Sequence, residues 1–385
     1  MVDKLAKKKC TGCSACYNIC PKDCIRMEAD EEGFLYPKID LQECNQCNLC
    51  RKVCPAINGF NNKNHHAPQI KAGWSLNTEV RFHSTSGGIF TELSKNILEN
   101  KGYVVGARYT EEHLVEHEII DNIEEITILR QSKYIQSKIG FTYRRIKELL
   151  EKNKKVLFVG TPCQTSGLLN YMRKDYENLL LCDFVCLGCN SPKVYLKYLS
   201  MLEHRYDSKV KQVWFKNKTY GWNNFSTKVE FENGSVYLKD RNTDYFMKGY
   251  IGKSKLYMRP CCAECNYKSI PRISDITLAD FWGIADKDKE LDSDQGTSLI
   301  MINSKKGEVL FNNSIGNIFS ADCELKDAVK GNPAIFTPAT MDTRRKDFFK
   351  ELDEIGFDEL MNRYTKESFW KKLKKTIHIK WLRCP

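Results

Sequence analysis

Apolar and polar positions follow two periods along the chain, one typical of strands and the other of helices. The apolar runs at 102–109 (GYVVGARY) and 154–162 (KKVLFVGTP) have strand character, and each stands beside a stretch with helical periodicity, at 88–100 and 141–153. Strands that alternate with helices in this way predict an α/β layer with a largely parallel sheet.

A different pattern appears further along. Residues 225–240 (FSTKVEFENGSVYLKD) alternate apolar and polar side chains on both sides of Asn233-Gly234, which predicts a β-hairpin. The body of the chain is therefore expected to be α+β with an α/β core. A chain of 385 residues is too long for one simple core and predicts two or three domains.

Composition narrows the class of protein. A hydrophobic content of 42% with 28% charged residues is typical of a globular protein, and no apolar run is long enough for a transmembrane helix. The N-terminal stretch MVDKLAKKKC is basic but has no apolar core, so we expect no secretory signal and a cytoplasmic location. The net charge of +11 comes with no nucleic-acid-binding module, so we expect no nucleic-acid partner.

Two cysteine motifs stand near the N-terminus. Residues 10–21 (CTGCSACYNICP) and 44–55 (CNQCNLCRKVCP) share cysteine spacings of two, two and three residues and end in proline. In a reducing compartment, clustered cysteines are usually metal ligands or catalytic groups. This duplicated motif is the signature of a bacterial-type ferredoxin with two [4Fe-4S] clusters, in which the fourth cysteine of each motif binds the other cluster.

The motif therefore assigns four ligands to each cluster. The alternative is a pair of zinc sites, although structural zinc usually separates its two CxxC pairs by a longer loop. Cys24 fits neither motif and is expected to be a small buried residue. The first cluster would be held by Cys10, Cys13, Cys16 and Cys54, and the second by Cys20, Cys44, Cys47 and Cys50.

Four stretches in the body join small, polar or reactive residues to expected strand or helix ends. In STSGGIF (84–90), two glycines before a helix let backbone amides approach an anion, although Ser86 could simply cap the helix. QSKYIQSKIG (131–140) offers polar contacts or plain surface groups. VLFVGTPCQTSGL (156–168) and SDITLADFWGI (274–284) each end a strand where α/β sheets bind ligands.

Together with CDFVCLG (182–188) and RPCCAEC (259–265), these stretches resemble the coenzyme F420 hydrogenase/dehydrogenase beta-subunit family. The resemblance implies an FAD that exchanges electrons between iron–sulfur clusters and an organic substrate. Members use a deazaflavin coenzyme or reduce tetrapyrroles, and many bacterial members lie among surface-polysaccharide genes. This chain departs from the family at Leu187, where a histidine is common, so an acid/base role does not carry over to that position.

The resemblance also implies site residues. The flavin phosphates would lie near Ser84, Ser86, Gly87 and Gly88, with Lys133 offsetting their charge. The other cofactor contacts would be Gln136, Ser137, Thr161, Pro162 and Gly283. The expected catalytic residues are Cys163, Gln164, Asp280 and Trp282.

A third metal site is a further hypothesis. The CxxC at 262–265 is a typical half-site, and the GTPCQ and CDFVCLG stretches could complete it if their strands are neighbours. The site would hold iron–sulfur or zinc, whereas the alternative is a set of separate buried cysteines. Its expected ligands are Cys163, Cys186, Cys262 and Cys265, with Cys182, Cys189 and Cys261 as further candidates.

These observations predict a ferredoxin domain (1–60), a linker (61–75), a flavin-binding domain (76–340) and a basic helical tail (341–385). In the tail, Phe369, Leu373 and Ile377 form one stripe of a helix that either docks on the body or touches a membrane surface.

The predicted function is a flavin-dependent iron–sulfur oxidoreductase. Its partners would be a ferredoxin or reductase and a small organic substrate. The alternatives are an electron-transfer subunit without its own substrate pocket and, less favoured, a redox sensor.

Overall fold

A computed structural model describes residues 2–60, 62–252 and 255–365. The N-terminal domain pairs strands β1 (Ile25–Ala29) and β2 (Leu35–Ile39) antiparallel. Both cysteine motifs lie beside its short helices, α1 (Ala15–Ile19), α2 (Leu49–Lys52) and α3 (Pro55–Asn58). Each cysteine motif thus includes a short helical turn, which is compatible with the close cysteine spacing of a cluster motif.

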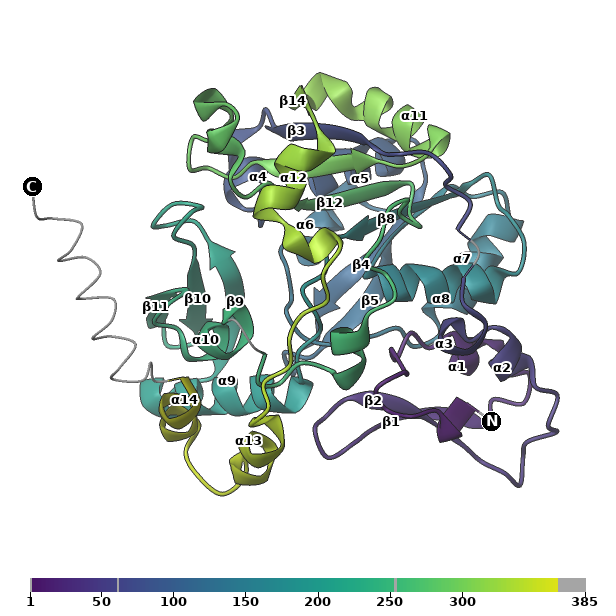
Figure 1. Cartoon of the computed structure of the whole chain (residues 1–385), viewed down its shortest axis with the longest axis horizontal. Helices are drawn as coiled ribbons and strands as arrows, with labels where there is room; N and C mark the ends of the chain where they lie inside the picture. The colour runs from purple at the N-terminus through teal and green to yellow at the C-terminus, as the bar shows by residue number, and fades with distance from the viewer. Residues whose placement is uncertain (1, 61, 253–254, 366–385) are drawn as a thin grey trace, which may run out of the picture.

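The body is built on a nine-stranded sheet (Figure 1). Strands β12, β8, β7 and β4 run parallel to one another in the centre. Strands β13, β3 and β14 pair antiparallel at one end, and β5 pairs antiparallel with β4 toward the other. The expectation of a largely parallel sheet was therefore wrong, because the sheet is mixed. Its order is β14 (Ile318–Cys323), β3 (Gln69–Ser75), β13 (Ser298–Ile302), β12 (Ile276–Asp280), β8 (Leu179–Phe184), β7 (Val156–Val159), β4 (Tyr103–Tyr109), β5 (Val115–Ile120) and β6 (Ser137–Lys138).

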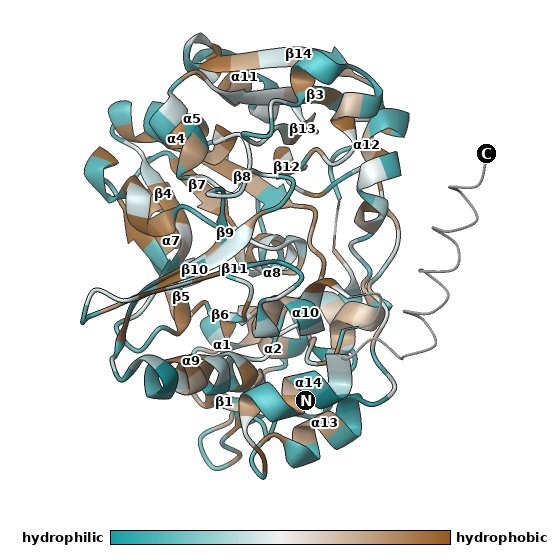
Figure 2. Cartoon of the chain, turned by 90° about the vertical axis from the view of Figure 1, so that its left-hand side faces the viewer, coloured by the Kyte–Doolittle hydropathy of each residue, from teal (hydrophilic) through white to brown (hydrophobic). Residues whose placement is uncertain are grey.

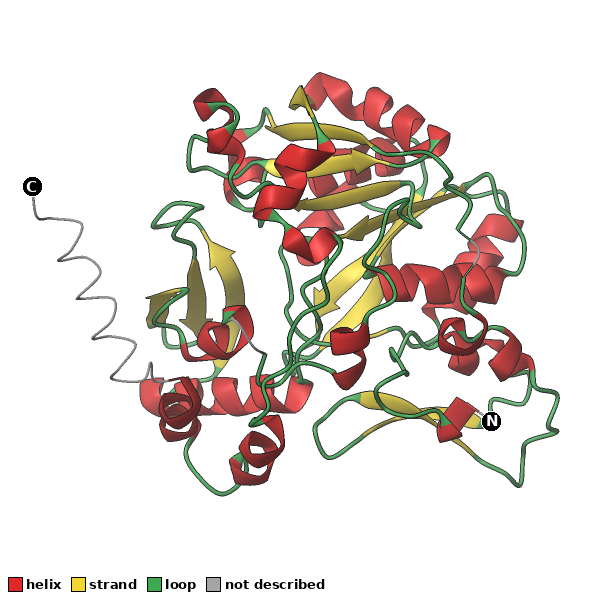
Figure 3. Cartoon of the chain, in the orientation of Figure 1, coloured by secondary structure: helices red, strands yellow, loops and turns green. Residues whose placement is uncertain are grey.

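Helices cover both faces of this sheet, as Figure 3 shows. Alternation along the strands explains the arrangement, since Leu157 and Leu180 face α5 (Ile89–Glu99) and α11 (Lys305–Ser314), whereas Phe158 and Leu181 face α7 (Thr142–Glu151) and α8 (Pro162–Met172). Near β3 and β13, α12 (Leu325–Gly331) joins the apolar core. Figure 2 shows the resulting hydrophobic colours along β4 and β8. The expected strands at 102–109 and 154–162 are confirmed, and so are the helices beside them.

A smaller antiparallel sheet follows the large one. It has the order β11 (Val236–Asp240), β10 (Ser226–Phe231) and β9 (Val210–Asn217). The hairpin between β10 and β11 turns at Gly234 with φ +84°, so the predicted hairpin is confirmed. Its core is shared with α9 (Pro192–Tyr206), α10 (Tyr245–Ile251), α13 (Arg345–Glu351) and α14 (Phe357–Thr365).

The remaining short elements connect these layers. They are η1 (Val2–Lys4), α4 (Thr78–Phe82), η2 (Ile123–Glu125), α6 (Ile126–Leu129), η3 (Pro260–Glu264), η4 (Ile284–Asp286), η5 (Lys289–Leu291), η6 (Ile315–Asn317) and η7 (Pro333–Ile335).

The structure has regular elements in two of the expected segments, the linker and the tail. Strand β3 occupies residues 69–75 of the segment expected to be a linker, and α13 and α14 lie within the expected tail. The amphipathic stripe of Phe369, Leu373 and Ile377 lies outside the described residues. Within the described part of the chain, no helix is both long and apolar enough to cross a bilayer.

The N-terminal domain is held against the body by hydrogen bonds to its backbone. Arg144 on α7 donates to the carbonyls of Asn18 (2.7 Å) and Cys20 (2.9 Å) and pairs with Asp23. Helix α1 packs against α8, where Gly167 leaves room for Cys13, because a Cβ there would lie 2.9 Å from the cysteine Sγ. The domain is thus docked with one cysteine motif facing inward.

The small sheet depends on one buried carboxylate, and this gives a stability prediction. Asp244 caps α10 by accepting from the Met247 amide, and it also accepts from the hydroxyls of Tyr198 (2.8 Å) and Tyr237 (2.9 Å). Asp244→Ala would leave these buried donors without an acceptor. It should lower the free energy of unfolding by about 3 kcal/mol, measured by urea denaturation. Asp244→Asn keeps a capping oxygen and should lose less. An alanine variant with the wild-type midpoint would contradict this role.

Candidate functional site

A cavity of about 580 Å³ lies where the N-terminal domain, the large sheet and the small sheet meet. Thr11 and Phe60 border it from the N-terminal domain, and Lys216 of β9 borders it from the small sheet. The carboxyl ends of β7, β8 and β12 supply much of the remaining wall. This is the edge at which α/β sheets bind ligands.

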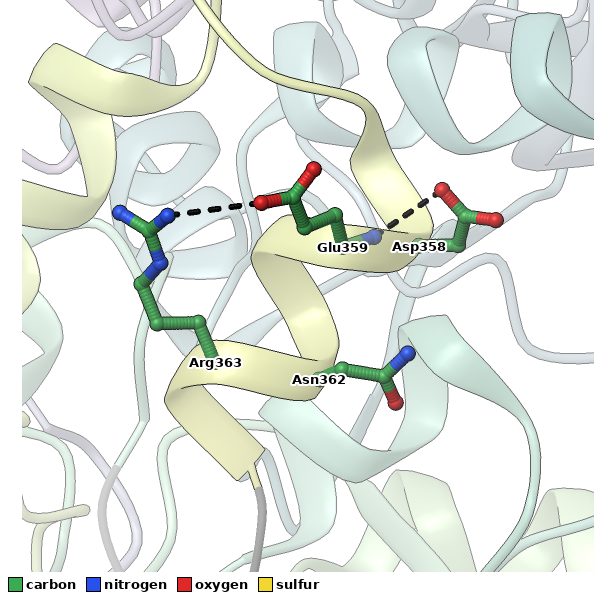
Figure 4. A pocket seen from close by; sticks show the side chains of 4 residues that line it. All are labelled: Asp358, Glu359, Asn362 and Arg363. Atoms are coloured by element: carbon green, nitrogen blue, oxygen red, sulfur yellow. Dashed lines mark hydrogen bonds and ion pairs between the residues drawn. The ribbon is translucent and has the colours of Figure 1, made fainter.

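A second hollow, of about 500 Å³, lies on α14 and contains none of the predicted site residues (Figure 4). Its charges are largely paired, since Arg363 binds Glu359 and also Glu351. The lining residues are Asp358, Glu359, Asn362 and Arg363.

The N-terminal cysteines form two neighbouring groups. In the first, Cys13 and Cys16 are buried and lie near Cys10 and Cys54. Burial raises the pKa of the Cys13 thiol to about 12, and the neighbouring thiolates of Cys54 and Cys10 act in the same direction. A bound cation would offset the cost of ionising these buried thiols.

The second group lies closer to the surface. Cys50 is near Cys44 and Cys47, and Cys47 is exposed. Cys24 is buried, as expected, with its Sγ 3.4 Å from that of Cys20, and Cys44 lies near it. The four cysteines expected in the second cluster are thus linked through Cys24.

A further cysteine set gathers on the cavity wall. Cys163, in the first turn of α8, lies near Cys186, Cys262 and Cys265, and all four border the cavity. Burial raises the pKa of Cys163 well above its ordinary value, and the three neighbouring thiols add to that shift. Sequence motifs separated by about a hundred residues therefore meet at one place.

The three additional candidates differ in position. Cys189 lies near Cys186 and Cys262, and Cys261 hydrogen-bonds Cys262. Cys182 belongs to the core between β8 and α5, with Asp183 and Asp275 as its charged neighbours. Among the described residues, no three His, Cys, Asp or Glu side chains meet at the spacing of a single metal ion, a finding that concerns single ions. A four-iron cluster takes its thiolates at four separate irons.

The expected phosphate-binding loop lies at the N-terminus of α5. Gly88 is the N-cap residue with φ +90°, and Ser84, Ser86 and Gly88 border the cavity. The Ser86 hydroxyl donates to the Thr297 carbonyl at 2.9 Å, so the alternative that Ser86 caps the helix was wrong. Gly87 lies behind the cavity wall, where its amide donates to the Ser298 hydroxyl.

Buried cations surround this loop. Lys133 donates to the carbonyl of Arg130 at 2.6 Å, and Lys218 donates to the carbonyls of Arg81 (2.7 Å) and Ser86 (2.5 Å). Burial lowers the pKa of both lysines to about 7. Arg81 donates to the carbonyl of Gly296, and burial lowers its pKa to about 10.

Sequence reasoning found Lys133 but missed Arg81 and Lys218. Arg81 precedes the STSGG motif by only three residues, which is a weak signal. Lys218 reaches the loop from the end of β9 by a long-range contact, so nothing local in the sequence marks it.

Gln136 and Ser137 border the cavity but are bonded to protein groups. The Gln136 amide oxygen accepts from the Leu35 amide (2.8 Å) and from Arg259. Ser137 shares a 2.6 Å hydrogen bond with His117, a cavity residue that sequence reasoning missed.

The GTPCQ turn forms a capping box at the start of α8. The Thr161 hydroxyl accepts from the Gln164 amide, and the Gln164 side-chain oxygen accepts from the Thr161 amide at 2.9 Å. Pro162 takes the first helical position, where it needs no amide partner. The side chain of Gln164 is thus bound to its own helix, while Cys163 faces the cysteine set.

Asp280 and Trp282 lie on the wall formed with the small sheet. Asp280 pairs with the Lys216 ammonium and accepts from the Trp222 indole at 3.1 Å, and Trp222 stacks on Trp282 at 4.3 Å. Burial alone would lower the pKa of Lys216, but Asp280 and Tyr134 together outweigh burial, and the pKa is raised. Gly283 begins η4 with φ +78° and does not border the cavity.

Comparisons with known proteins bear on this arrangement. Residues 153–322 match the family that represents the C terminus of the beta subunit in coenzyme F420 hydrogenase/dehydrogenase, and residues 9–57 match the 4Fe-4S dicluster domain. The latter match supports iron–sulfur clusters in the N-terminal domain. A search of curated proteins found no match.

Among solved structures, the chain is similar to one from the xenon-derivatised F420-reducing [NiFe] hydrogenase complex of Methanosarcina barkeri. The two share 17% identity with a TM-score of 0.47, over 77% of this chain and 91% of the other.

His117 gives a pH prediction for the site. Burial lowers its pKa to about 4, so its ring is neutral at pH 7. Between that value and the ordinary pKa of about 6.5, the unfolded chain binds more protons than the folded one, so stability falls as the pH is lowered through this window. The expected loss between pH 7 and pH 4.5 is about 2 kcal/mol, measured by urea denaturation. His117→Asn should lack this component, and an unchanged pH dependence in the variant would contradict the assignment.

Proposed function

Since the chain belongs to the coenzyme F420 hydrogenase/dehydrogenase beta-subunit family, we propose that it is an iron–sulfur flavoprotein oxidoreductase that uses FAD to reduce or oxidise a small organic compound. The observation that carries this proposal is the shared cavity. It is bordered at once by the N-terminal domain, by four gathered cysteines and by a helix N-terminus surrounded by buried cations.

The chemistry of the phosphate-binding loop fits the diphosphate of FAD. Ser84, Ser86 and Gly88 border the cavity at the N-terminus of α5, and a helix N-terminus favours anions. The Ser84 and Ser86 hydroxyls already donate to backbone carbonyls, so the backbone at the helix N-terminus would make the contact. Lys133 and Lys218 donate their hydrogen bonds to backbone carbonyls, which carry no net charge. A bound anion would therefore supply the negative charge that balances these two ammonium groups. Gly87 supports the loop from behind, since a Cβ there would lie 2.4 Å from the Gly73 carbonyl oxygen.

The substrate would enter on the side of the small sheet. Lys216, Phe225, Arg241 and Trp282 border the cavity there, and they combine aromatic surface with positive charge. The pair between Lys216 and Asp280 fixes both side chains, so we assign them to orienting the substrate. A bound flavin would join the one-electron chemistry of iron–sulfur clusters to the two-electron chemistry of an organic substrate.

The cysteine groups lie in a sequence from the surface to the cavity. Cys47 is exposed, so an outer cluster held by Cys20, Cys44, Cys47 and Cys50 would lie where a partner ferredoxin or reductase could dock. The inner group (Cys10, Cys13, Cys16 and Cys54) touches α8 through Cys13. The same helix presents Cys163 to the cavity. We therefore assign Cys163, Cys186, Cys262 and Cys265 to a third iron–sulfur cluster rather than giving Cys163 a catalytic role.

The size of the cavity favours an enzyme over an electron-transfer subunit without a substrate pocket. A volume of about 580 Å³ lies within the range of small-molecule and cofactor sites. A subunit that only relays electrons would not need the aromatic and basic wall opposite the cysteines.

Flavin binding tests the central claim. Anaerobically purified protein should contain FAD, and apoprotein should rebind it with an affinity that falls as the pH rises from 7 to 9. The sign follows from Lys133 and Lys218, whose ammonium groups lose their protons above about pH 7 and then attract the anion less. Lys133→Met should weaken binding roughly tenfold, measured by FAD fluorescence.

Lys138→Met is the matched control for this titration, because Lys138 lies in the same segment and is exposed. It should bind FAD like the wild type. Protein with a full complement of iron that neither contains nor binds FAD would refute the proposal.

Metal analysis tests the third cluster separately. Wild-type protein should contain about twelve irons per chain, and Cys163→Ser should retain about eight. Cys323→Ser, on edge strand β14 and away from the cavity, should keep the wild-type content. Wild-type protein with about eight irons, or with zinc in addition to eight, would show that the gathered cysteines hold no third iron–sulfur cluster.

A further inference from the structure

Arg259 is a buried cation that reaches from the body into the N-terminal domain. It precedes η3 and is only 1% exposed. Its Nε donates to the Cys10 carbonyl, and its Nη2 donates to the Leu35 carbonyl, both at 3.0 Å. Its Nη1 donates to Gln136, also at 3.0 Å. Two nitrogens of one guanidinium therefore bind the N-terminal domain, and the third binds Gln136 on the cavity wall.

The same guanidinium lies against a cluster cysteine. Its Nη2 is 3.9 Å from the Cys10 Sγ, and its carbon lies 4.2 Å from the centre of the Tyr36 ring. Gly12 allows this approach, because a Cβ at that position would lie 3.0 Å from Nη1. No carboxylate forms an ion pair with Arg259 among the residues that the structure describes.

A buried, unpaired charge is costly, so a compensating anion is expected nearby. The groups within reach that can carry negative charge are cysteine thiols and the Tyr36 phenol, with Cys10 in direct contact. Burial raises the pKa of Tyr36, which leaves the thiolates as the compensating anions. The backbone of Arg259 also binds the gathered cysteines, since its amide donates to the Cys189 carbonyl (2.7 Å) and its carbonyl accepts from the Cys262 amide (3.0 Å). Arg259 therefore lies between the inner cluster group and the cavity set.

We infer that Arg259 is a positioning residue that raises the reduction potential of the inner N-terminal cluster through Cys10. The inference rests on the proposed function for the clusters and does not depend on FAD. Reduction adds a negative charge to the cluster, and an adjacent cation in a low-dielectric setting stabilises that added charge. An N–H group directed at a ligand sulfur acts in the same direction, because hydrogen bonds to the sulfurs and net charge set cluster potentials.

As a consequence, the inner N-terminal cluster would have a higher reduction potential than the outer one. The outer group, which includes exposed Cys47, has Arg144 nearby, but that arginine binds carbonyls and is neutralised by Asp23. The inner group has an arginine that forms no carboxylate pair within the described residues. Electrons arriving at the surface would therefore be drawn inward, toward the cysteines that border the cavity.

An anaerobic redox titration followed by electron paramagnetic resonance tests this inference on the full-length protein. In Arg259→Gln, one of the two N-terminal clusters should shift to a more negative potential, while the other keeps its wild-type value. Arg259→Lys keeps the charge but not the fork, so it should shift the same cluster in the same direction by a smaller amount.

Arg144→Gln is the matched control, because it removes a docking arginine from the same interface without touching Cys10. It should leave the inner cluster at its wild-type potential. An inner cluster with wild-type potential in loaded Arg259→Gln would overturn the inference; if that variant does not load, the same result in Arg259→Lys would overturn it.

Loss of clusters in both Arg259 variants would assign Arg259 to assembly instead, which also overturns a role in the potential. FAD content is measured on the same samples. Protein without flavin but with the predicted shift would refute the proposed function and leave this inference standing.

Discussion

Helix α8 is in contact with two cysteine sets at once, and the arrangement of the site depends on this constraint. Its first turn carries Cys163, and one turn later Gly167 touches Cys13 of the N-terminal domain. Residues four apart lie on the same side of a helix, so one short stretch faces both sets. A side chain at position 167 would push the domains apart. The small residue thus sets how closely the N-terminal domain approaches the cavity.

Electrostatics follows from the same close packing. Docking removes cysteines from water, and desolvation makes their ionised forms costly. Arg259 lies beside Cys10, where a thiolate would form. Lys133 and Lys218 lie around the loop before α5, where an anion would bind. These cations have carbonyl and amide partners in place of carboxylates. Bound clusters and a bound diphosphate would complete the charge balance of the interior.

Local sequence patterns were sufficient to predict the elements whose signal lies within a few residues. The cysteine spacing, the strands before Gly160 and up to Asp280, and the hairpin at Gly234 are all of this kind. Strand direction was harder to predict, because β3 comes from a stretch that looks like a linker and pairs antiparallel with both β13 and β14. Apolar periodicity does not encode which neighbour a strand will take.

The predicted site residues show the same contrast between local signals, which the sequence reveals, and long-range contacts, which it does not. Ser84, Gly88, Lys133 and Cys163 do border one cavity, as their motifs suggested. Gln136 and Gln164 border it as well, but their amide oxygens bind the protein itself. Lys216, Lys218 and His117 were missed, because each reaches the site through a contact distant in sequence. Arg81 was missed because its place three residues before the STSGG motif is only a weak signal. Propensity and spacing carry no record of such contacts.

Iron-edge anomalous diffraction from anaerobically grown crystals would test the central claim most directly, because it locates each iron rather than counting it. The account predicts three separate iron maxima. Two would lie at the N-terminal cysteine groups, and the third would lie among Cys163, Cys186, Cys262 and Cys265, with flavin density in the adjoining cavity beside Ser84 and Gly88. Two maxima only, with the cavity free of flavin, would contradict it.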